Sequence, residues 1–475
     1  MRPLQLSEIA HMTGGRLHGD DVVVDAIATD TRALPAGGAA LFVALKGERF
    51  DGHDHLAANV GSVAAALVSR VVAVDMPQVV VTDTARALAD FAAALQRERS
   101  TKVVAITGSN GKTSVKALLL AILQCAAQRA DLAVYANPGN RNNEIGLPLA
   151  VIDAPDDADY AIYEMGAGKP GDIAYLTAIA RPSVALVNNI APAHLERMGS
   201  LLGVADTKAA AYDALPADGV AVINADDAFA PYFAERAHGR QLIRFGLDAS
   251  ADVTARAVQP GVDGSHFILV TPAGEAAIAL AMPGRHNVRN ALAAASLALA
   301  LGIPLDVIAD GLNAAQPVAG RLISHRLGKG ALLIDDSYNA NPGSLAAAID
   351  TLAEMGGDGR NGEAWLVLGD MRELGDDADA MHAEAGRRAK AAGISRLYAL
   401  GELSRAAAGA FGDGAQVFTD HAALATMLAA DLAAMADGAA GVRVLAKGSR
   451  GSAMDRIVTA LVSNRAADQG DTDAA

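Results

Sequence analysis

The chain alternates short, continuous runs of hydrophobic residues with longer segments in which apolar and polar positions recur at helical spacing. Clear runs cover 102–107, 159–165, 183–190 and 219–226, and turn or polar residues bound each of them. Continuous apolar runs of this length are typical of buried parallel strands, and the periodic segments between them are typical of helices that cover a sheet. The pattern therefore predicts an α/β protein built on parallel sheets.

The same pattern divides the chain into three predicted domains and a tail. Residues 1–100 hold short apolar runs and end in an Ala-rich helical segment, which predicts a small α/β domain. Residues 101–320 predict a doubly wound or similar α/β nucleotide domain. Residues 321–463 repeat the strand–helix alternation and predict another parallel, Rossmann-like sheet. The polar residues 464–475 are expected to form a disordered tail.

One stretch of the second domain departs from the parallel alternation. Residues 265–284 contain two apolar segments separated by a Pro-Ala-Gly turn, which predicts a β-hairpin. The Ala- and Leu-rich residues 287–302 that follow predict a long helix.

Length, charge and composition argue against a nucleic-acid-binding protein and against a membrane-spanning one. A chain of 475 residues fits about three domains, and 39 Lys plus Arg against 54 Asp plus Glu give a net charge of −15. Such a chain has no bulk attraction for nucleic acid or anionic membranes. The longest uncharged stretch, 290–305, is shorter than the ~20 apolar residues of a membrane-spanning helix. With the single Cys125 and no signal-peptide pattern, we expect a cytoplasmic protein with no nucleic-acid partner and no stable membrane insertion.

The strongest local signal is the sequence ITGSNGKTS at 106–114, between a predicted buried strand and an amphipathic helix. Gly108 and Gly111 let backbone amides turn toward phosphates, Lys112 adds a positive charge, and the Thr113 hydroxyl suits Mg²⁺. The stretch departs from the strict P-loop pattern because Ile106 replaces its first glycine. An ordinary glycine-rich turn is the alternative, and Lys-Thr at the helix start argues against it. The predicted nucleotide-binding loop comprises Gly108, Ser109, Asn110, Gly111, Lys112, Thr113 and Ser114.

Three further residues are candidates for a Mg²⁺–ATP site. Glu164 ends a predicted strand, where α/β sheets place their ligands, and hard cations prefer oxygen. His194 follows the next predicted strand in a loop, and Lys208 lies in a predicted helix. Taken alone, a loop histidine is more often solvated or structural, and a helical lysine is by default a solvated surface residue.

An ordered set of motifs resembles the Mur ligase family along essentially the whole chain. The set runs TGSNGKTS, NPGNRNNEIGLPL, YEMGA, NNIAPAHLERMGS, VINADD, PGRHNVRNALAA, DDSYNANPGS, VLGDMRELG and AKGSRG. The resemblance implies an N-terminal UDP-substrate domain, a central ATPase domain with a parallel sheet, and a C-terminal Rossmann-like domain that closes over the nucleotide. Monomer is the family's default state.

Within the family, the motifs resemble the dipeptide-adding branch. That branch adds D-alanyl-D-alanine to UDP-N-acetylmuramoyl-tripeptide through an acyl phosphate, and it consumes ATP in peptidoglycan biosynthesis. The nearest alternative is another Mur ligase or a folylpolyglutamate-synthetase-like amide ligase on the same scaffold. A P-loop kinase, a GTPase and a non-catalytic nucleotide-sugar binder fit the chain less well. The identity of the tripeptide's third residue stays open.

The resemblance also implies roles for the candidate residues. Thr113 and Glu164 would hold the ATP-bound Mg²⁺, and His194 with a carbamylated Lys208 would place a second ion. The catalytic set implied is Lys112, His194, Lys208 and Arg321, with Arg321 also at the γ-phosphate. Asn287 matches an adenine contact with Asn290 nearby, and Asp336 faces the ribose. Ala210 stands where the family often has Glu, so the partners of Lys208 are expected to differ.

The substrate residues rest on weaker motifs. Thr31, Arg32, Lys46 and Gly47 match the region that faces the UDP-sugar, where Arg suits phosphate or carboxylate. Asn140, Asn142 and Asn143 are candidates for the acceptor's peptide end, and Asn339 and Asn341 for the D-Ala-D-Ala site. A purely local role in turns is an equal alternative for all of them.

Overall fold

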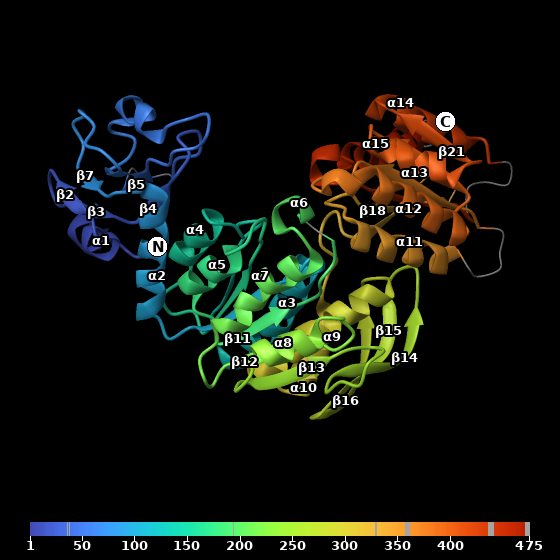
Figure 1. The fold of residues 1–475 in the computed structure, drawn as a ribbon, viewed down its shortest axis with the longest axis horizontal. Coiled ribbons are helices and arrows are strands. Elements are labelled where there is room, and N and C mark those ends of the chain that lie inside the picture. Colours follow the sequence, from blue (N-terminus) through green and yellow to red (C-terminus); the bar gives the residue numbers. More distant parts are fainter. Residues whose placement is uncertain are drawn as a thin grey trace.

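The chain folds into three α/β parts that follow one another along the sequence (Figure 1). In this computed structural model the N-terminal part (blue) and the C-terminal part (red) lie at opposite ends, with the central part between them. The structure describes residues 1–35, 37, 39–192, 194–327, 330–356, 362–435 and 441–470, and only the backbone of 464–470. Within these ranges no helix has the length and apolar character needed to cross a membrane.

The N-terminal part is built around a five-stranded sheet. Its elements are β1 (Leu4–Gln5), α1 (Leu6–Thr13), β2 (Arg16–His18), β3 (Val23–Val24), β4 (Ala26–Ala28), β5 (Ala40–Val43), η1 (Gly52–His55), η2 (Ala57–Asn59), β6 (Ala65–Val68), β7 (Gln78–Val80) and α2 (Thr84–Glu98). The sheet order is β2-β7-β6-β5-β4, and only β2 runs antiparallel to its neighbour. Helix α2 begins at Asp83, whose carboxylate accepts two backbone N–H bonds, and it packs on the central part.

The central part carries a six-stranded, fully parallel sheet. Its elements are β8 (Lys102–Thr107), α3 (Lys112–Ala130), β9 (Val134–Ala136), α4 (Gly146–Asp153), β10 (Tyr160–Glu164), α5 (Asp172–Ala180), β11 (Val184–Val187), α6 (Leu195–Met198), α7 (Leu201–Asp213), β12 (Val220–Asn224), α8 (Ala230–Arg236) and β13 (Gln241–Phe245). The order is β13-β12-β11-β8-β10-β9, so β8 lies in the interior of the sheet. The predicted strands of this part are confirmed to within a few residues.

Strand β8 is buried on both faces, which explains its continuous apolar sequence. Val104 and Ile106 pack into the core that includes α3, while Val103 and Ala105 pack into the core on the other face, which includes α5 and α7. Each of these four residues is at most 1% exposed. A strand fixed in this way holds the loop that follows it in one position.

The predicted hairpin is confirmed, and the structure adds a third strand to it. Strands β14 (Thr254–Pro260), β15 (Ser265–Thr271) and β16 (Gly274–Leu280) form an antiparallel sheet. The predicted long helix is α9 (Arg285–Ala300), and it packs with α10 (Leu305–Ala314) against α3. These two helices cover the face of the parallel sheet that also holds α3.

The C-terminal part has a second six-stranded sheet in the order β17-β18-β22-β19-β20-β21, of which only β17 is antiparallel. Its elements are β17 (Ile323–Arg326), β18 (Leu332–Asp336), α11 (Pro342–Gly356), β19 (Ala364–Gly369), η4 (Gly375–Asp377), α12 (Ala378–Ala391), β20 (Arg396–Leu400), α13 (Ser404–Phe411), β21 (Ala415–Phe418), α14 (His421–Ala433), β22 (Arg443–Lys447), η6 (Arg450–Ser452) and α15 (Asp455–Gly470). Helices and parallel strands alternate as predicted, and the α/β class is confirmed.

The last helix, α15, runs to Gly470, and residues 471–475 lie outside the described residues. The disordered tail expected over 464–475 stays a prediction. The predicted limits of the three domains stay predictions.

Candidate active site

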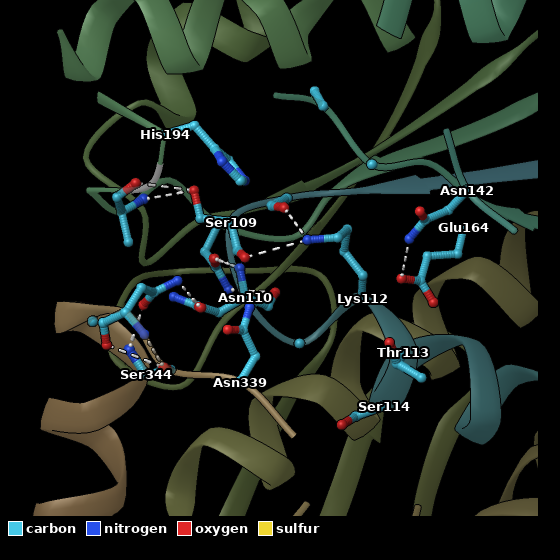
Figure 2. A pocket seen from close by; sticks show the side chains of 18 of the residues that line it. Ser109, Asn110, Lys112, Thr113, Ser114, Asn142, Glu164, His194, Asn339 and Ser344 are labelled. Carbon is cyan, nitrogen blue, oxygen red and sulfur yellow. Dashed lines mark hydrogen bonds between the residues drawn. The ribbon is translucent and has the colours of Figure 1, made fainter. Parts of the chain in front are cut away.

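A cavity of about 690 Å³ lies at the carboxyl ends of the central strands and extends to the C-terminal part (Figure 2). The loops that follow β8, β9, β10 and β11 line one side of it, and residues after β18 line the other. This is the edge at which open α/β sheets bind ligands. The predicted site residues that line it are Gly108, Ser109, Asn110, Gly111, Lys112, Thr113, Ser114, Asn140, Asn142, Asn143, Glu164, His194, Lys208, Asn287, Asn290, Arg321, Asp336, Asn339 and Asn341.

The glycines of the predicted nucleotide-binding loop, Gly108 to Ser114 and called the phosphate loop below, are required by backbone conformation and by close neighbours. Gly108 has φ +144° and Gly111 has φ +79°, both in the range that favours glycine. A Cβ on Gly111 would lie 2.5 Å from both Asn188 Nδ2 and Asn290 Oδ1. The loop therefore packs directly on the side-chain amides of Asn188 and Asn290. The backbone N–H groups of the loop lie at the start of α3.

Substitution of Gly111 by alanine is expected to destabilise the protein more than the same change at Gly302. Both positions have almost the same φ, +79° and +81°, but nothing lies within 4 Å of a Cβ on Gly302. The left-handed backbone alone costs about 1–2 kcal/mol, and overpacking at Gly111 adds about 1–3 kcal/mol. Urea unfolding of Gly111→Ala and Gly302→Ala measures the difference, and equal losses would contradict the close packing of the loop.

Lys112 begins α3 and folds back over the phosphate loop. Its Nζ donates hydrogen bonds to the backbone oxygens of Gly108 at 2.7 Å and Ser109 at 3.3 Å (Figure 2). Burial lowers the pKa of Lys112, nearby Glu164 opposes that shift, and Arg321 adds to it. A half-buried cation at a helix N-terminus creates a site that attracts phosphate.

Glu164 and its partners form the acidic part of the cavity. Its side chain is 5% exposed, Oε1 accepts a hydrogen bond from Asn142 Nδ2 at 3.0 Å, and Oε2 lies 3.3 Å from Lys116 Nζ. Burial favours a higher pKa for Glu164, but Lys116 and Lys112 together hold its pKa below the usual range. The carboxylate is therefore ionised at neutral pH.

Lys116 is a residue of this site that sequence reasoning missed. Besides Glu164, its Nζ contacts the backbone oxygens of Asn137 at 3.0 Å and Gly139 at 3.1 Å. These bonds tie the carboxylate to the loop that carries Asn140 to Asn143. The one feature of the sequence that could have identified Lys116 is its position on the otherwise apolar, buried face of a predicted helix.

Lys208 and His194 lie on the side of the cavity toward α7 and α6. Lys208 is 3% exposed, and within the described part of the chain its amine has no hydrogen bond or ion pair. Burial, together with Lys112, lowers the pKa of Lys208 to about 7. Burial also lowers the pKa of His194, whose Nδ1 lies 2.6 Å from Glu373 Oε2. Without the family resemblance, the sequence favoured a solvated surface position for Lys208. The structure shows that this expectation is wrong, because Lys208 is buried.

The C-terminal part contacts the loop of residues 108–114 directly. Arg321 Nη2 donates to Thr113 Oγ1 at 2.9 Å, and its guanidinium lies 4.5 Å from the centre of the Tyr338 ring. Asn341 Nδ2 donates to Asn110 Oδ1 at 2.7 Å. Two segments more than 200 residues apart therefore meet at the phosphate loop.

The residues predicted to contact adenine and ribose each have a protein partner in the structure. Asn290 Nδ2 donates to Asn287 Oδ1 at 3.2 Å, and both side chains are buried. Asp336 forms an ion pair of 2.5 Å with Lys447, which sequence reasoning did not single out. Burial raises the pKa of Asp336, and Lys447 opposes that rise. Their adenine and ribose roles stay predictions.

The four predicted UDP-sugar residues lie apart from this cavity, in the N-terminal part. The exposed Arg32 bonds to Asp30, with Nη2 2.6 Å from Oδ2. Gly47 lies under the ring of Phe50, where a Cβ would approach the ring to 2.4 Å. Thr31, Arg32, Lys46 and Gly47 are not among the residues that line the cavity, so their substrate role stays a prediction.

The residues of the cavity suit a hard cation held jointly with phosphate. Across the ranges that the structure describes, no group of three or more His, Cys, Asp and Glu side chains could hold a metal by itself. Glu164 Oε2 is buried and, apart from the ion pair with Lys116, has no hydrogen-bond partner among the described residues, and the Thr113 hydroxyl belongs to the same cavity. Mg²⁺ is commonly bound by one or two protein oxygens together with substrate phosphates, so this oxygen pair fits it.

Known proteins match the chain over nearly its whole length. Residues 106–298 match the Mur ligase middle domain, and residues 320–450 match the Mur ligase, glutamate ligase domain. The UDP-N-acetylmuramoyl-tripeptide–D-alanyl-D-alanine ligase of Escherichia coli K12 is 43% identical over 467 residues, 98% of this chain and 99% of that protein. A crystal structure of MurF from Acinetobacter baumannii has a TM-score of 0.90 and 32% identity, covering 98% and 99% of the two chains. MurF from Thermotoga maritima in complex with ADP has a TM-score of 0.81 and 26% identity, covering 94% and 99%.

Proposed function

Because the chain belongs to the Mur ligase family, we propose that it joins D-alanyl-D-alanine to UDP-N-acetylmuramoyl-tripeptide and consumes ATP. The observation that carries the proposal is the 43% identity to a ligase of that name over 98% of the chain. This favours the dipeptide-adding ligase over a folylpolyglutamate-synthetase-like enzyme. The phosphate loop, its cations and Glu164 supply a site of the required chemistry.

The chemistry requires a carboxylate to attack a phosphate, and both are anions. The carboxylate of the tripeptide attacks the γ-phosphorus of ATP, and the bond from that phosphorus to ADP breaks. The D-Ala-D-Ala amine then attacks the resulting acyl phosphate, loses a proton, and displaces phosphate as the amide forms. Lys112 and Arg321 offset the charge that gathers at the γ-phosphate, and the loop amides at the start of α3 orient it.

Thr113 and Glu164 are the proposed Mg²⁺ ligands from this chain. The support is the buried Glu164 oxygen without a hydrogen bond and the adjacent hydroxyl. Bound Mg²⁺ would neutralise part of the phosphate charge. His194 and Lys208 are proposed for a second ion, with Lys208 as its carbamate. A neutral lysine amine adds to CO₂ and releases a proton, and the buried Lys208 has the lowered pKa that this requires.

The remaining substrate assignments follow from position. Asn287 is proposed to contact adenine, Asp336 the ribose, and Asn142 the acceptor's peptide end, because all three line the cavity. Thr31, Arg32, Lys46 and Gly47 are proposed to bind the UDP-sugar in the domain of residues 1–100. The domains 101–320 and 321–463 enclose the nucleotide. We also propose a cytoplasmic monomer without a nucleic-acid partner, in keeping with the net charge of −15 and the single cysteine.

Mass spectrometry tests this proposal directly. Purified protein is mixed with ATP, Mg²⁺, UDP-N-acetylmuramoyl-tripeptide and D-Ala-D-Ala, and the expected product is UDP-N-acetylmuramoyl-pentapeptide with ADP and phosphate. Omission of each component in turn is the control. Product formed with glutamate and a folate in place of these substrates, and not with them, would support the alternative ligase instead.

A further inference from the structure

A direct contact between an imidazole and a carboxylate joins the central and C-terminal parts beside the cavity. His194 lies in the loop that follows β11, and its Nδ1 is 2.6 Å from Oε2 of Glu373, which follows β19. Helix α6 packs against η4 at the same place. His194 lines the cavity, whereas Glu373 does not. Figure 2 shows the imidazole extending into the cavity, toward the phosphate loop.

Both His194 and Glu373 have a left-handed backbone although neither is glycine. His194 has φ +53° and Glu373 has φ +63°. Such conformations are unfavourable for residues with a Cβ and persist where the surrounding structure holds them. The flanking Met198 and Leu374 are buried, at 6% and 3% exposure, and anchor the two loops. In these backbone conformations the side chains of His194 and Glu373 point toward each other.

The contact between His194 and Glu373 is too exposed to matter much for stability. The His194 side chain is 39% exposed and that of Glu373 is 65% exposed, and even charged pairs with this exposure contribute little to folding. Its geometric effect is larger. A carboxylate at Nδ1 selects the neutral tautomer that carries its proton there, and this leaves the Nε2 lone pair as the free acceptor of the ring.

We propose that Glu373 is a positioning residue for His194, which fixes the tautomer and orientation of the imidazole when the C-terminal part is docked. The inference rests on the function proposed above, in which His194 is proposed to hold a second ion with Lys208. The tautomer and orientation of the His194 imidazole would then depend on the position of the C-terminal part. The adjacent Asp376 is exposed and forms no ion pair with His194, so it provides a matched carboxylate in the same loop.

Nitrogen-15 NMR of histidine side chains tests the positioning without substrates. Protein labelled at histidine is compared at one fixed pH as wild type, Glu373→Ala and Asp376→Asn, and a His194→Gln variant assigns the His194 signals. Wild type and Asp376→Asn are expected to show the Nδ1-protonated tautomer, and Glu373→Ala a mixture of tautomers. Glu373→Gln, whose amide oxygen can still accept from Nδ1, is expected to keep the wild-type signals.

Steady-state kinetics test the consequence for the reaction. Glu373→Ala is expected to lower kcat by about 10–100-fold with the KM for ATP unchanged, and Glu373→Gln to lose less than Glu373→Ala. Asp376→Asn is expected to match wild type. Unmoved His194 signals in Glu373→Ala, or an unchanged kcat, would overturn the proposal. A wild-type protein that forms no ligation product would contradict the proposed function instead, and the NMR comparison separates these two failures.

Discussion

Replacement of Lys112 by alanine is expected to lower the rate of ligation by about 10³-fold or more. The Lys112 amine donates two hydrogen bonds to backbone oxygens of the phosphate loop. Groups placed to stabilise developing charge contribute about 10²–10³-fold each, and phosphoryl transfer depends on them heavily. The melting temperature without nucleotide is expected to change little, because the partial desolvation that lowers the pKa of Lys112 offsets what its two hydrogen bonds contribute.

The control for this variant is Lys102→Ala. Lys102 begins β8, ten residues before Lys112, and its side chain is exposed. Both variants remove one positive charge from the same strand–loop–helix unit, so a general effect of net charge would appear in both. Near-wild-type turnover by folded Lys112→Ala protein would show that this loop does not bind the reacting phosphates.

Replacement of Lys208 by methionine is expected to remove most of the ligation activity while the protein becomes no less stable. The lysine is 3% exposed, and no hydrogen bond or ion pair of its amine occurs among the residues that the structure covers. An unpaired buried amine is unfavourable, and replacing such a group by an apolar one of similar volume is often neutral or stabilising. If Lys208 helps to hold a metal ion as proposed, the expected loss of kcat is about 10³-fold.

Chemical rescue separates a ligand role of Lys208 from a packing role. If its carbamate supplies an oxygen ligand, a short carboxylic acid added to Lys208→Ala is expected to restore part of the activity by placing an oxygen in the vacated space. The same acid is expected to have no effect on Lys112→Ala, whose missing group is a cation. Full activity of Lys208→Met, with mass data showing an unmodified lysine in wild type, would return Lys208 to a structural role.

Local patterns predicted the phosphate loop because its parts are adjacent in sequence. Strand β8, the glycine turn and helix α3 follow one another, so apolar runs, two glycines and Lys-Thr were sufficient to identify them. The strand order and the two faces of β8 depend on contacts between distant segments, and a single sequence does not show these. For the same reason Glu373 was missed, since its partner His194 lies 179 residues away.

Other residues were missed or left open because their meaning depends on burial. Lys116 resembles any helical lysine in sequence, and only the folded chain places it 3.3 Å from Glu164. Lys447 ends a C-terminal strand and becomes notable only through its ion pair with Asp336. Conversely, Arg32 was a candidate for the UDP-sugar, and its present partner is the neighbouring Asp30.

Oxygen-isotope transfer tests the central claim most directly, because it follows the bond that the proposed reaction breaks. The tripeptide acceptor is prepared with ¹⁸O in both oxygens of the carboxyl group to be joined, and the phosphate released with ATP and D-Ala-D-Ala is analysed by mass. An acyl phosphate leaves one labelled oxygen in the new amide and transfers the other to phosphate. The account predicts one ¹⁸O atom in each phosphate released per amide formed, and amide formation with unlabelled phosphate would contradict it.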